Sequence, residues 1–168
     1  LFRNDSYAKS VKAAYKAQKS ALWTYGFYGG KQYCGSVHGD KNITKDNYET
    51  VFATKPLNTV DGAFQNHDWN SYNLRTYTFY DFNSKQSLEA DKILVQELAA
   101  ILTSGEVFDA NGNALTGEDL QEALNAAMDA YIFFSTIVIP DKEEKVNESL
   151  NNESQNQSNY YYDPYLDP

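Results

Sequence analysis

The sequence predicts a compact, mainly α-helical domain with a small β-hairpin. Its 168 residues are 42% hydrophobic, which is enough to bury one core without disulfides. Apolar residues recur every three or four positions in several segments, as on the buried face of a helix. Asn111-Gly112 lies between short apolar stretches and predicts the hairpin. We expect the domain to span residues 1–140 and an acidic, Asn/Ser-rich flexible tail to follow at 141–168.

The first half of the chain is predicted to hold two helices separated by a loop. Apolar residues at helical spacing predict the first helix over residues 6–23. The glycines that follow are too dense for a helix or strand, so we expect a loop with unusual backbone dihedrals. They are Gly26, Gly29, Gly30, Gly35 and Gly39. A second helix is expected to begin near Pro56, because Asn58 and Asp61 resemble an N-terminal capping pair.

The second half is predicted to add two more helices. Residues 75–82 are rich in Tyr, Thr and Phe, and they are read either as extended or as an irregular continuation of the second helix. A third helix is expected over residues 88–102, and a fourth from a cap at Thr116 to about Phe134. Pro140 is expected to stop the apolar segment before it. From Asp141 onward, the tail is predicted to be disordered or to form a strand on a protein partner.

Charge and composition exclude several function classes. The net charge of −9 argues against nucleic acid as a partner. The first 39 residues are nevertheless basic and contain Trp23 and Phe27, so we expect residues 1–30 to touch a membrane surface; a solvated helix face and ordinary core packing are the alternatives. No apolar run approaches about 18 residues, so no transmembrane helix is predicted. The single cysteine, Cys34, excludes an internal disulfide and cysteine-cluster zinc sites.

Two polar residues occupy positions where a helix would bury hydrophobes. His67 lies on the apolar face of the second helix, and Asp91 lies in the apolar stripe of the third. A buried carboxylate needs a partner, and a His–Asp pair fixes the imidazole tautomer as a general base requires. The alternative is that His67 is an ordinary core histidine and Asp91 meets a tyrosine. Asp129, on the fourth helix, is a rival partner for the histidine.

Asp68 follows His67 and points to a different side of the same helix. It could reach the glycine-rich loop, where several backbone carbonyls can turn inward. Calcium binds about 6–8 oxygen ligands, many of them backbone carbonyls. One helical carboxylate with loop carbonyls therefore predicts a site for Ca²⁺, which next to a general base would polarise an ester carbonyl.

Residues 56–68, PLNTVDGAFQNHD, resemble the active-site helix of phospholipase A2-like domains in the spacing from Pro56 to Asp61 and on to His67-Asp68. Two upstream segments, 25–30 and 33–35, look like that family's Tyr-x-Gly calcium loop. Downstream, Asp91 follows an alanine, as in the disulfide-free viral and bacterial branch. The resemblance covers residues 25–102 and implies a compact helical phospholipase A2-like fold with antiparallel active-site helices.

The resemblance also implies roles for individual residues. His67 would activate water, Asp91 would orient His67, and Asp68 would be the side-chain calcium ligand. Asp129 ranks below Asp91 on this match. The main-chain calcium ligands are expected near Tyr28 and Gly30, or near Tyr33 and Gly35. The implied reaction is calcium-dependent hydrolysis of the sn-2 acyl ester of glycerophospholipids, with a phospholipid membrane surface as substrate.

Two function classes remain at the level of sequence. The chain is either this hydrolase or a catalytically inactive phospholipase A2-like module that binds or builds a virion or secreted assembly. Protein partners would be recruited through the C-terminal tail. A calcium-dependent lipase needs more calcium than resting cytosol holds, so the resemblance implies a secreted enzyme, a delivered toxin or a virion-associated protein.

Overall fold

The computed structural model describes residues 24–30 and 33–159, and helices dominate it. The longer helices are α3 (Thr59–Ser71), α4 (Lys85–Ser104), α5 (Gly117–Phe133) and α6 (Ile139–Asn159), with a short α2 (Tyr48–Phe52) and a 3-10 turn, η1 (Asp40–Asn42). The prediction of a mainly α fold is confirmed. The helix expected at residues 6–23 lies outside the described residues.

The β structure consists of three short antiparallel hairpins in the described part of the chain. These pair β1 (Thr24–Tyr25) with β2 (Gly29–Gly30), β3 (Tyr33–Cys34) with β4 (Val37–His38), and β5 (Tyr72–Asn73) with β6 (Thr78–Phe79). The glycine-rich loop therefore folds into two tight hairpins. Segment 75–82 does not continue the second helix: residues 75–77 belong to the turn of the third hairpin, and only Thr78–Phe79 form a strand. The hairpin predicted around Asn111-Gly112 is reduced to one bridge, between Phe108 and Ala114.

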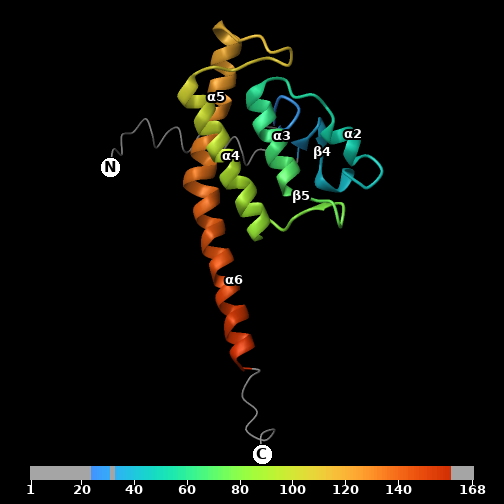
Figure 1. Cartoon of the computed structure of the whole chain (residues 1–168), viewed down its shortest axis with the longest axis vertical. Helices are drawn as coiled ribbons and strands as arrows, with labels where there is room; N and C mark the ends of the chain where they lie inside the picture. Colours follow the sequence, from blue (N-terminus) through green and yellow to red (C-terminus); the bar gives the residue numbers. More distant parts are fainter. Residues whose placement is uncertain (1–23, 31–32, 160–168) are drawn as a thin grey trace, which may run out of the picture.

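Helices α3 and α4 pack side by side in opposite directions (Figure 1). The backbone N–H of Thr59, at the start of α3, bonds to Phe108 beyond the end of α4, and Asn66 bonds to Glu97 nearer the middle. Helix α5 packs on α4, and the hairpins and α2 lie on the other side of α3. The core lies between these layers and includes the fully buried Val60 and Leu94.

Helices α5 and α6 form one long rod because a π-helical segment, η2 (Phe134–Val138), joins them without a break. The prediction that Pro140 stops the apolar segment before it is wrong, because the helix continues through this residue. Pro140 lies in the first turn of α6, just after η2, where the missing N–H is tolerated. Hydroxyls of Ser135 and Thr136 donate to carbonyls of the preceding turn, at 2.6 Å and 2.5 Å.

The expected flexible tail is a helix over most of its length. Residues 139–159 form α6, which projects well beyond the rest of the molecule (Figure 1). The first part of α6 packs on α4, and Lys142 and Val146 are buried there. A strand or a disordered chain was expected because the tail is rich in Asn, Ser and Glu. The periodic contacts of its first turns outweigh that composition.

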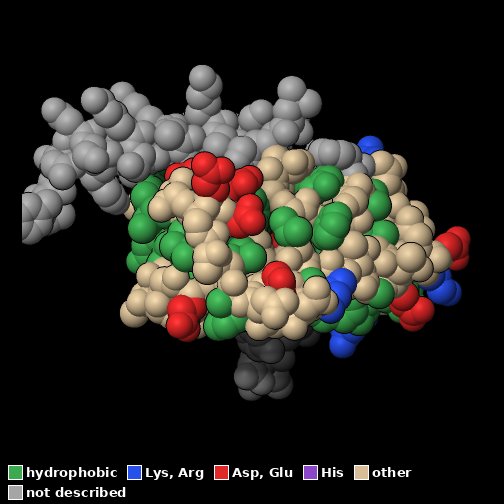
Figure 2. Space-filling model, turned by 90° about the horizontal axis from the view of Figure 1, so that it is seen from above, with side chains coloured by type: hydrophobic (Ala, Val, Ile, Leu, Met, Phe, Trp, Pro, Cys, Tyr) green, Lys and Arg blue, Asp and Glu red, His purple; other side chains and the backbone are tan. Residues whose placement is uncertain are grey.

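The surface and the long rod each add one observation. Seen along the rod, Lys and Arg lie toward the right of the visible face, where acidic side chains stand among them, and a further group of acidic side chains lies at the upper left (Figure 2). Among the described residues, one helical stretch, Gly117–Glu153, is long and apolar enough to cross a membrane, and 33% of its apolar window is buried. That is a weak indication, because the core helix of a soluble protein meets the same criterion. The sequence predicted no such segment because it did not foresee the continuity through η2.

Candidate functional site

One buried carboxylate ties the first turn of α3 to the turn between β1 and β2. Asp61 is fully buried and accepts hydrogen bonds from the backbone N–H groups of Phe27 and Tyr28, each at 3.0 Å, and of Leu57, at 2.8 Å. The expected capping pair is therefore only half formed. The side chain of Asn58 accepts hydrogen bonds from two N–H groups of the first turn. Asp61, however, accepts from N–H groups of Phe27, Tyr28 and Leu57 and not from that of the cap residue.

Gly26 makes the close approach of this turn possible. Its φ is +58°, and a Cβ there would lie 2.3 Å from the carboxyl carbon of Asp61. Both features exclude a side chain at this position. The turn is thereby held against the helix that carries His67 and Asp68.

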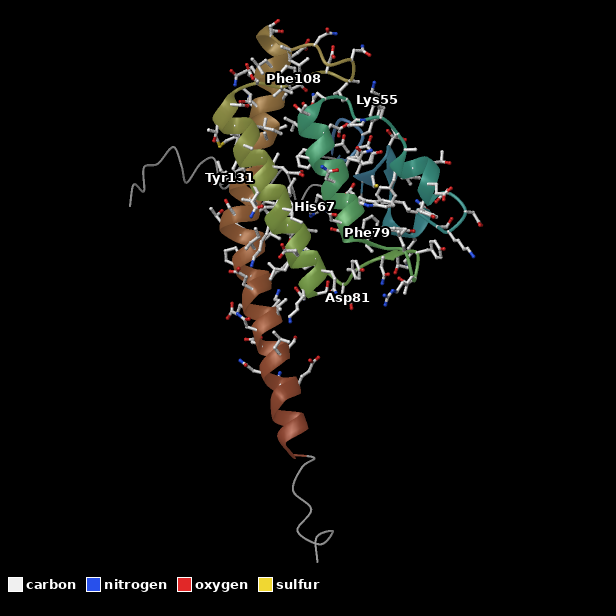
Figure 3. The ribbon with its side chains drawn as sticks, viewed as in Figure 1. Lys55, His67, Phe79, Asp81, Phe108 and Tyr131 are labelled. Atoms are coloured by element: carbon white, nitrogen blue, oxygen red, sulfur yellow. The ribbon has the colours of Figure 1, made fainter. Side chains whose placement is uncertain are left out.

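His67 and Asp91 meet across the interface between α3 and α4. Nε2 of His67 lies 2.7 Å from Oδ1 of Asp91, and the two side chains are 19% and 1% exposed. The ring of Phe134, on η2, packs edge-on against the imidazole, with centroids 5.3 Å apart. Figure 3 shows His67 where α3 faces α4. Asp91 rather than Asp129 is therefore the carboxylate that holds the histidine, as the sequence predicted.

Two carboxylates face the two nitrogens of this ring. Nδ1 of His67 lies 3.6 Å from Oδ1 of Asp68, on the side away from Asp91. Burial alone lowers the pKa of His67, but Asp68 and Asp91 outweigh burial and raise it to about 9. With Nε2–H donated to Asp91, Nδ1 is the nitrogen that can take up or release a proton.

A cavity of about 1160 Å³ opens beside this pair. His67, Asp68 and Asp91 line it, and so do Tyr28, Gly30 and Tyr33 from the glycine-rich hairpins. Its remaining wall combines polar side chains with a group of aromatic ones, which includes Phe64, Tyr77, Phe79, Phe82, Phe133 and Phe134. Acidic, imidazole and apolar groups thus share one space, which is the usual composition of a small-molecule site.

The structure separates the two proposed loop registers. Tyr28 and Gly30 lie in and after the turn that Asp61 holds, and both line the cavity. Tyr33 also lines it, but Gly35 does not. Gly35 faces α2, where a Cβ would lie 2.3 Å from the carbonyl oxygen of Val51.

The side chain of Tyr28 is buried under the loop and locks it to its neighbours. Its hydroxyl lies 2.6 Å from the carbonyl oxygen of Thr54 and accepts a hydrogen bond from Gln65 Nε2 at 2.9 Å. Burial raises the pKa of Tyr28 to about 12. Tyr28 can therefore offer the cavity its backbone, while its phenol is committed to structure.

Sequence reasoning missed one functional candidate, Lys142. Its Nζ lies 2.5 Å from Oδ2 of Asp91 and 2.7 Å from Oγ of Ser87, and the side chain is 2% exposed. The signal was present in the sequence, since Lys142 stands between Val138 and Val146 at helical spacing. It was overlooked because the segment from Asp141 was assigned to a tail.

The residues around Asp68 fit a hard cation in their chemistry. Asp68, Tyr28 and Gly30 line the same cavity, and carboxylate and main-chain oxygens are the ligands that calcium prefers. Across the described residues, no cluster of three or more His, Cys, Asp or Glu side chains is arranged to hold a metal. A cation here would thus depend on one carboxylate and on backbone carbonyls.

No protein-family model, curated protein or solved structure matches this chain.

Proposed function

We propose that this chain is a calcium-dependent hydrolase of the sn-2 acyl ester of glycerophospholipids, with a phospholipase A2-like arrangement of its active-site helices. The observation that carries the proposal is the 2.7 Å contact between His67 and Asp91 at the wall of a large aromatic cavity. A histidine oriented by a buried carboxylate is a general base, and an apolar cavity beside it suits an acyl chain.

The residues of the pair have distinct roles in the proposed reaction. Asp91 accepts the Nε2–H of His67 and leaves the lone pair on Nδ1 to take a proton from water. The oxygen of that water forms a bond to the ester carbonyl carbon. When the tetrahedral species collapses, the bond to the glycerol oxygen breaks and His67 returns the proton to that oxygen. The products are a fatty acid and a lysophospholipid, and no acyl-enzyme forms.

Asp68, Tyr28 and Gly30 are the residues that would hold calcium beside the base. When bound, the ion would polarise the ester carbonyl, stabilise the oxyanion and oppose protonation of the neighbouring imidazole. Asp61 and Gly26 support this part of the site, because they fix the loop against α3.

The cavity wall supports a lipid as substrate. Phe82 is 60% exposed and lines the cavity together with the buried Val138. Lys41 and Lys45 also line it and are exposed, so they can meet the phosphate of a head group. The proposed substrate surface is a phospholipid membrane, reached outside the producing cytosol by a secreted, delivered or virion-associated protein.

The test is fatty-acid release from vesicles of equal parts phosphatidylcholine and phosphatidylglycerol, labelled in either the sn-1 or the sn-2 chain. We expect the intact protein to release the sn-2 chain only when calcium is present. His67→Gln should lower the rate by about 10²–10⁴-fold, because it removes the base. Asp68→Asn should remove the calcium dependence together with most of the rate.

His38→Gln is the matched control, because it removes the other histidine of the chain and should leave the rate unchanged. Fatty-acid release by His67→Gln at the wild-type level would refute the assignment. Calcium-dependent binding of these vesicles without any release by the wild type would favour the inactive binding module instead.

A further inference from the structure

The His67–Asp91 pair contacts a third residue, Lys142, from a distant part of the chain. Asp91 offers Oδ1 to His67 and Oδ2 to Lys142, at 2.7 Å and 2.5 Å. His67 lies on α3, Asp91 on α4 and Lys142 on α6. Both oxygens of the carboxylate are therefore engaged, one by the base and one by an ammonium group.

The ammonium of Lys142 is held in place by more than its charge partner. Oγ of Ser87 accepts from Nζ at 2.7 Å, and the ring of Phe82 lies 3.9 Å from Nζ. Lys142 is 2% exposed and Asp91 is 1% exposed, so each charge depends mainly on the other for its compensation. Burial lowers the pKa of Lys142, and the charge of Asp91 partly offsets that effect.

A carboxylate with one partner can rotate about its last bond, whereas one held at both oxygens cannot. The contact to Lys142 fixes the plane of the Asp91 carboxylate and with it the direction in which Oδ1 meets Nε2 of His67. Pairing also removes the cost of leaving a buried negative charge unmatched. His67 can act as a base only if the Asp91 carboxylate is both fixed in its plane and charge-compensated, since the tautomer of the imidazole depends on a well-aligned acceptor at Nε2.

We propose that Lys142 is a positioning residue of the active site, acting through Asp91 with Ser87 as its anchor. The proposal rests on the proposed function for its catalytic meaning. Lys142 also lines the cavity, but in this role it acts on the base through Asp91 and not on the substrate or the attacking water. In this proposal α6 contributes a residue to the active site.

The decisive experiment is a kinetic double-mutant cycle on the full chain with the sn-2-labelled vesicles. Lys142→Met should lower kcat by about 10–10²-fold and leave KM nearly unchanged, since it disturbs only the base. Lys142→Arg should restore most of the rate, because it returns a cation to Oδ2. In an Asp91→Asn background, Lys142→Met should have no further effect, as expected for two residues that act as one unit.

The matched control is Lys92→Met. Lys92 also joins α4 to α6, through Glu143 at 2.9 Å, but this pair is exposed, so its loss should not change kcat. Ser87→Ala keeps both charges and tests the same idea if Lys142→Met does not fold. It should lower kcat by about 3–10-fold in the wild type and have no effect beside Asp91→Asn.

A second measurement separates this proposal from the enzyme assignment. NMR exchange of the His67 Nε2–H proton with water reports on the contact to Asp91 without any turnover. Exchange should be at least about tenfold faster in Lys142→Met, or in Ser87→Ala if the first variant does not fold, and unchanged in Lys92→Met. Unaltered exchange would overturn the positioning role, and so would effects on kcat that multiply with those of Asp91→Asn. Faster exchange in a protein without lipase activity would support the role and reject the proposed reaction.

Discussion

The imidazole of His67 lies between two carboxylates, and its protonation reports on both. Its pKa of about 9 exceeds the ordinary 6.5 because Asp68 and Asp91 outweigh the effect of burial. A raised pKa means that the folded protein binds the proton more tightly than the unfolded chain does. The proton therefore stabilises the fold fully below pH 6.5, and this contribution is lost as pH rises toward 9.

The first prediction concerns this titration in calcium-free protein. NMR of the His67 ring should show a midpoint near pH 9, and Asp68→Asn should lower the midpoint because it removes one of the two negative charges. Between pH 6 and pH 9.5, the wild type should lose roughly 3 kcal/mol more unfolding free energy than His67→Gln does. A midpoint at or below 6.5 would contradict this account of the site.

The second prediction isolates the close approach at Gly26. Gly26→Ala should destabilise the fold by several kcal/mol, roughly 3–5, because its Cβ would overlap the carboxyl group of Asp61 in addition to the backbone strain. Gly105→Ala is the matched control, since Gly105 has a similar φ of +66° and no atom within 4 Å of its Cβ. It should cost only about 1 kcal/mol. Equal costs in urea unfolding would show that the turn is not packed as described.

Among the elements, α6 differs most from its prediction, because a helix with buried residues replaces the expected flexible tail. Its first turns bury Lys142 and Val146 against α4, while its far end extends into solvent. The third prediction compares two truncations by urea unfolding. A chain that ends at Asp141 leaves Asp91 buried without its lysine and should lose about 3–5 kcal/mol. A chain that ends at Glu153 keeps both buried residues and should change by less than about 0.5 kcal/mol.

This comparison would fail if both truncated chains unfolded at the same urea concentration. It would also fail if the shorter chain were as stable as the full one, since the apolar and ionic contacts of α6 would then contribute nothing.

The helices that the sequence predicted well are those with both a cap and a periodic apolar face. α3 begins after the predicted cap, Asn58, and α4 contains the whole predicted range of residues 88–102. The junction at Pro140 was missed for a physical reason. A proline normally ends a helix, and only the π-helical turn before it allows the rod to continue. The hairpins were missed because two-residue strands have no readable alternation.

For the molecule as a whole, bound calcium should connect the β1–β2 hairpin to α3 and so stabilise the fold. The fourth prediction is that calcium at 100 times its Kd raises the unfolding free energy by about 2.7 kcal/mol and raises Tm accordingly. Asp68→Asn should abolish this shift. Asp109→Asn is the control, because Asp109 lies in a separate turn, where it accepts hydrogen bonds from the backbone N–H groups of Asn111 and Asn113. A shift that persists in Asp68→Asn, or is lost in Asp109→Asn, would place the ion elsewhere.

Much of the site could be predicted because its side chains are polar residues at positions of a helix that are otherwise apolar. His67 and Asp91 were both found as polar residues in apolar stripes, and the structure brings them together. Lys142 follows the same rule, but its helix was not recognised. The loop register was beyond prediction, because it depends on Asp61 and Gly26 meeting across a turn. That long-range contact leaves no local pattern in the chain.

The order of synthesis gives the ion pair at Lys142 a further meaning. During translation, α3 and α4 leave the ribosome before α6. The emerging chain therefore contains Asp91 before Lys142, which neutralises it, can pack against it. The pocket would be complete only once the rod from α5 to α6 has left the exit tunnel and docked. If the proposed lipid hydrolysis is correct, the nascent chain would have no complete active site until α6 has docked on α4.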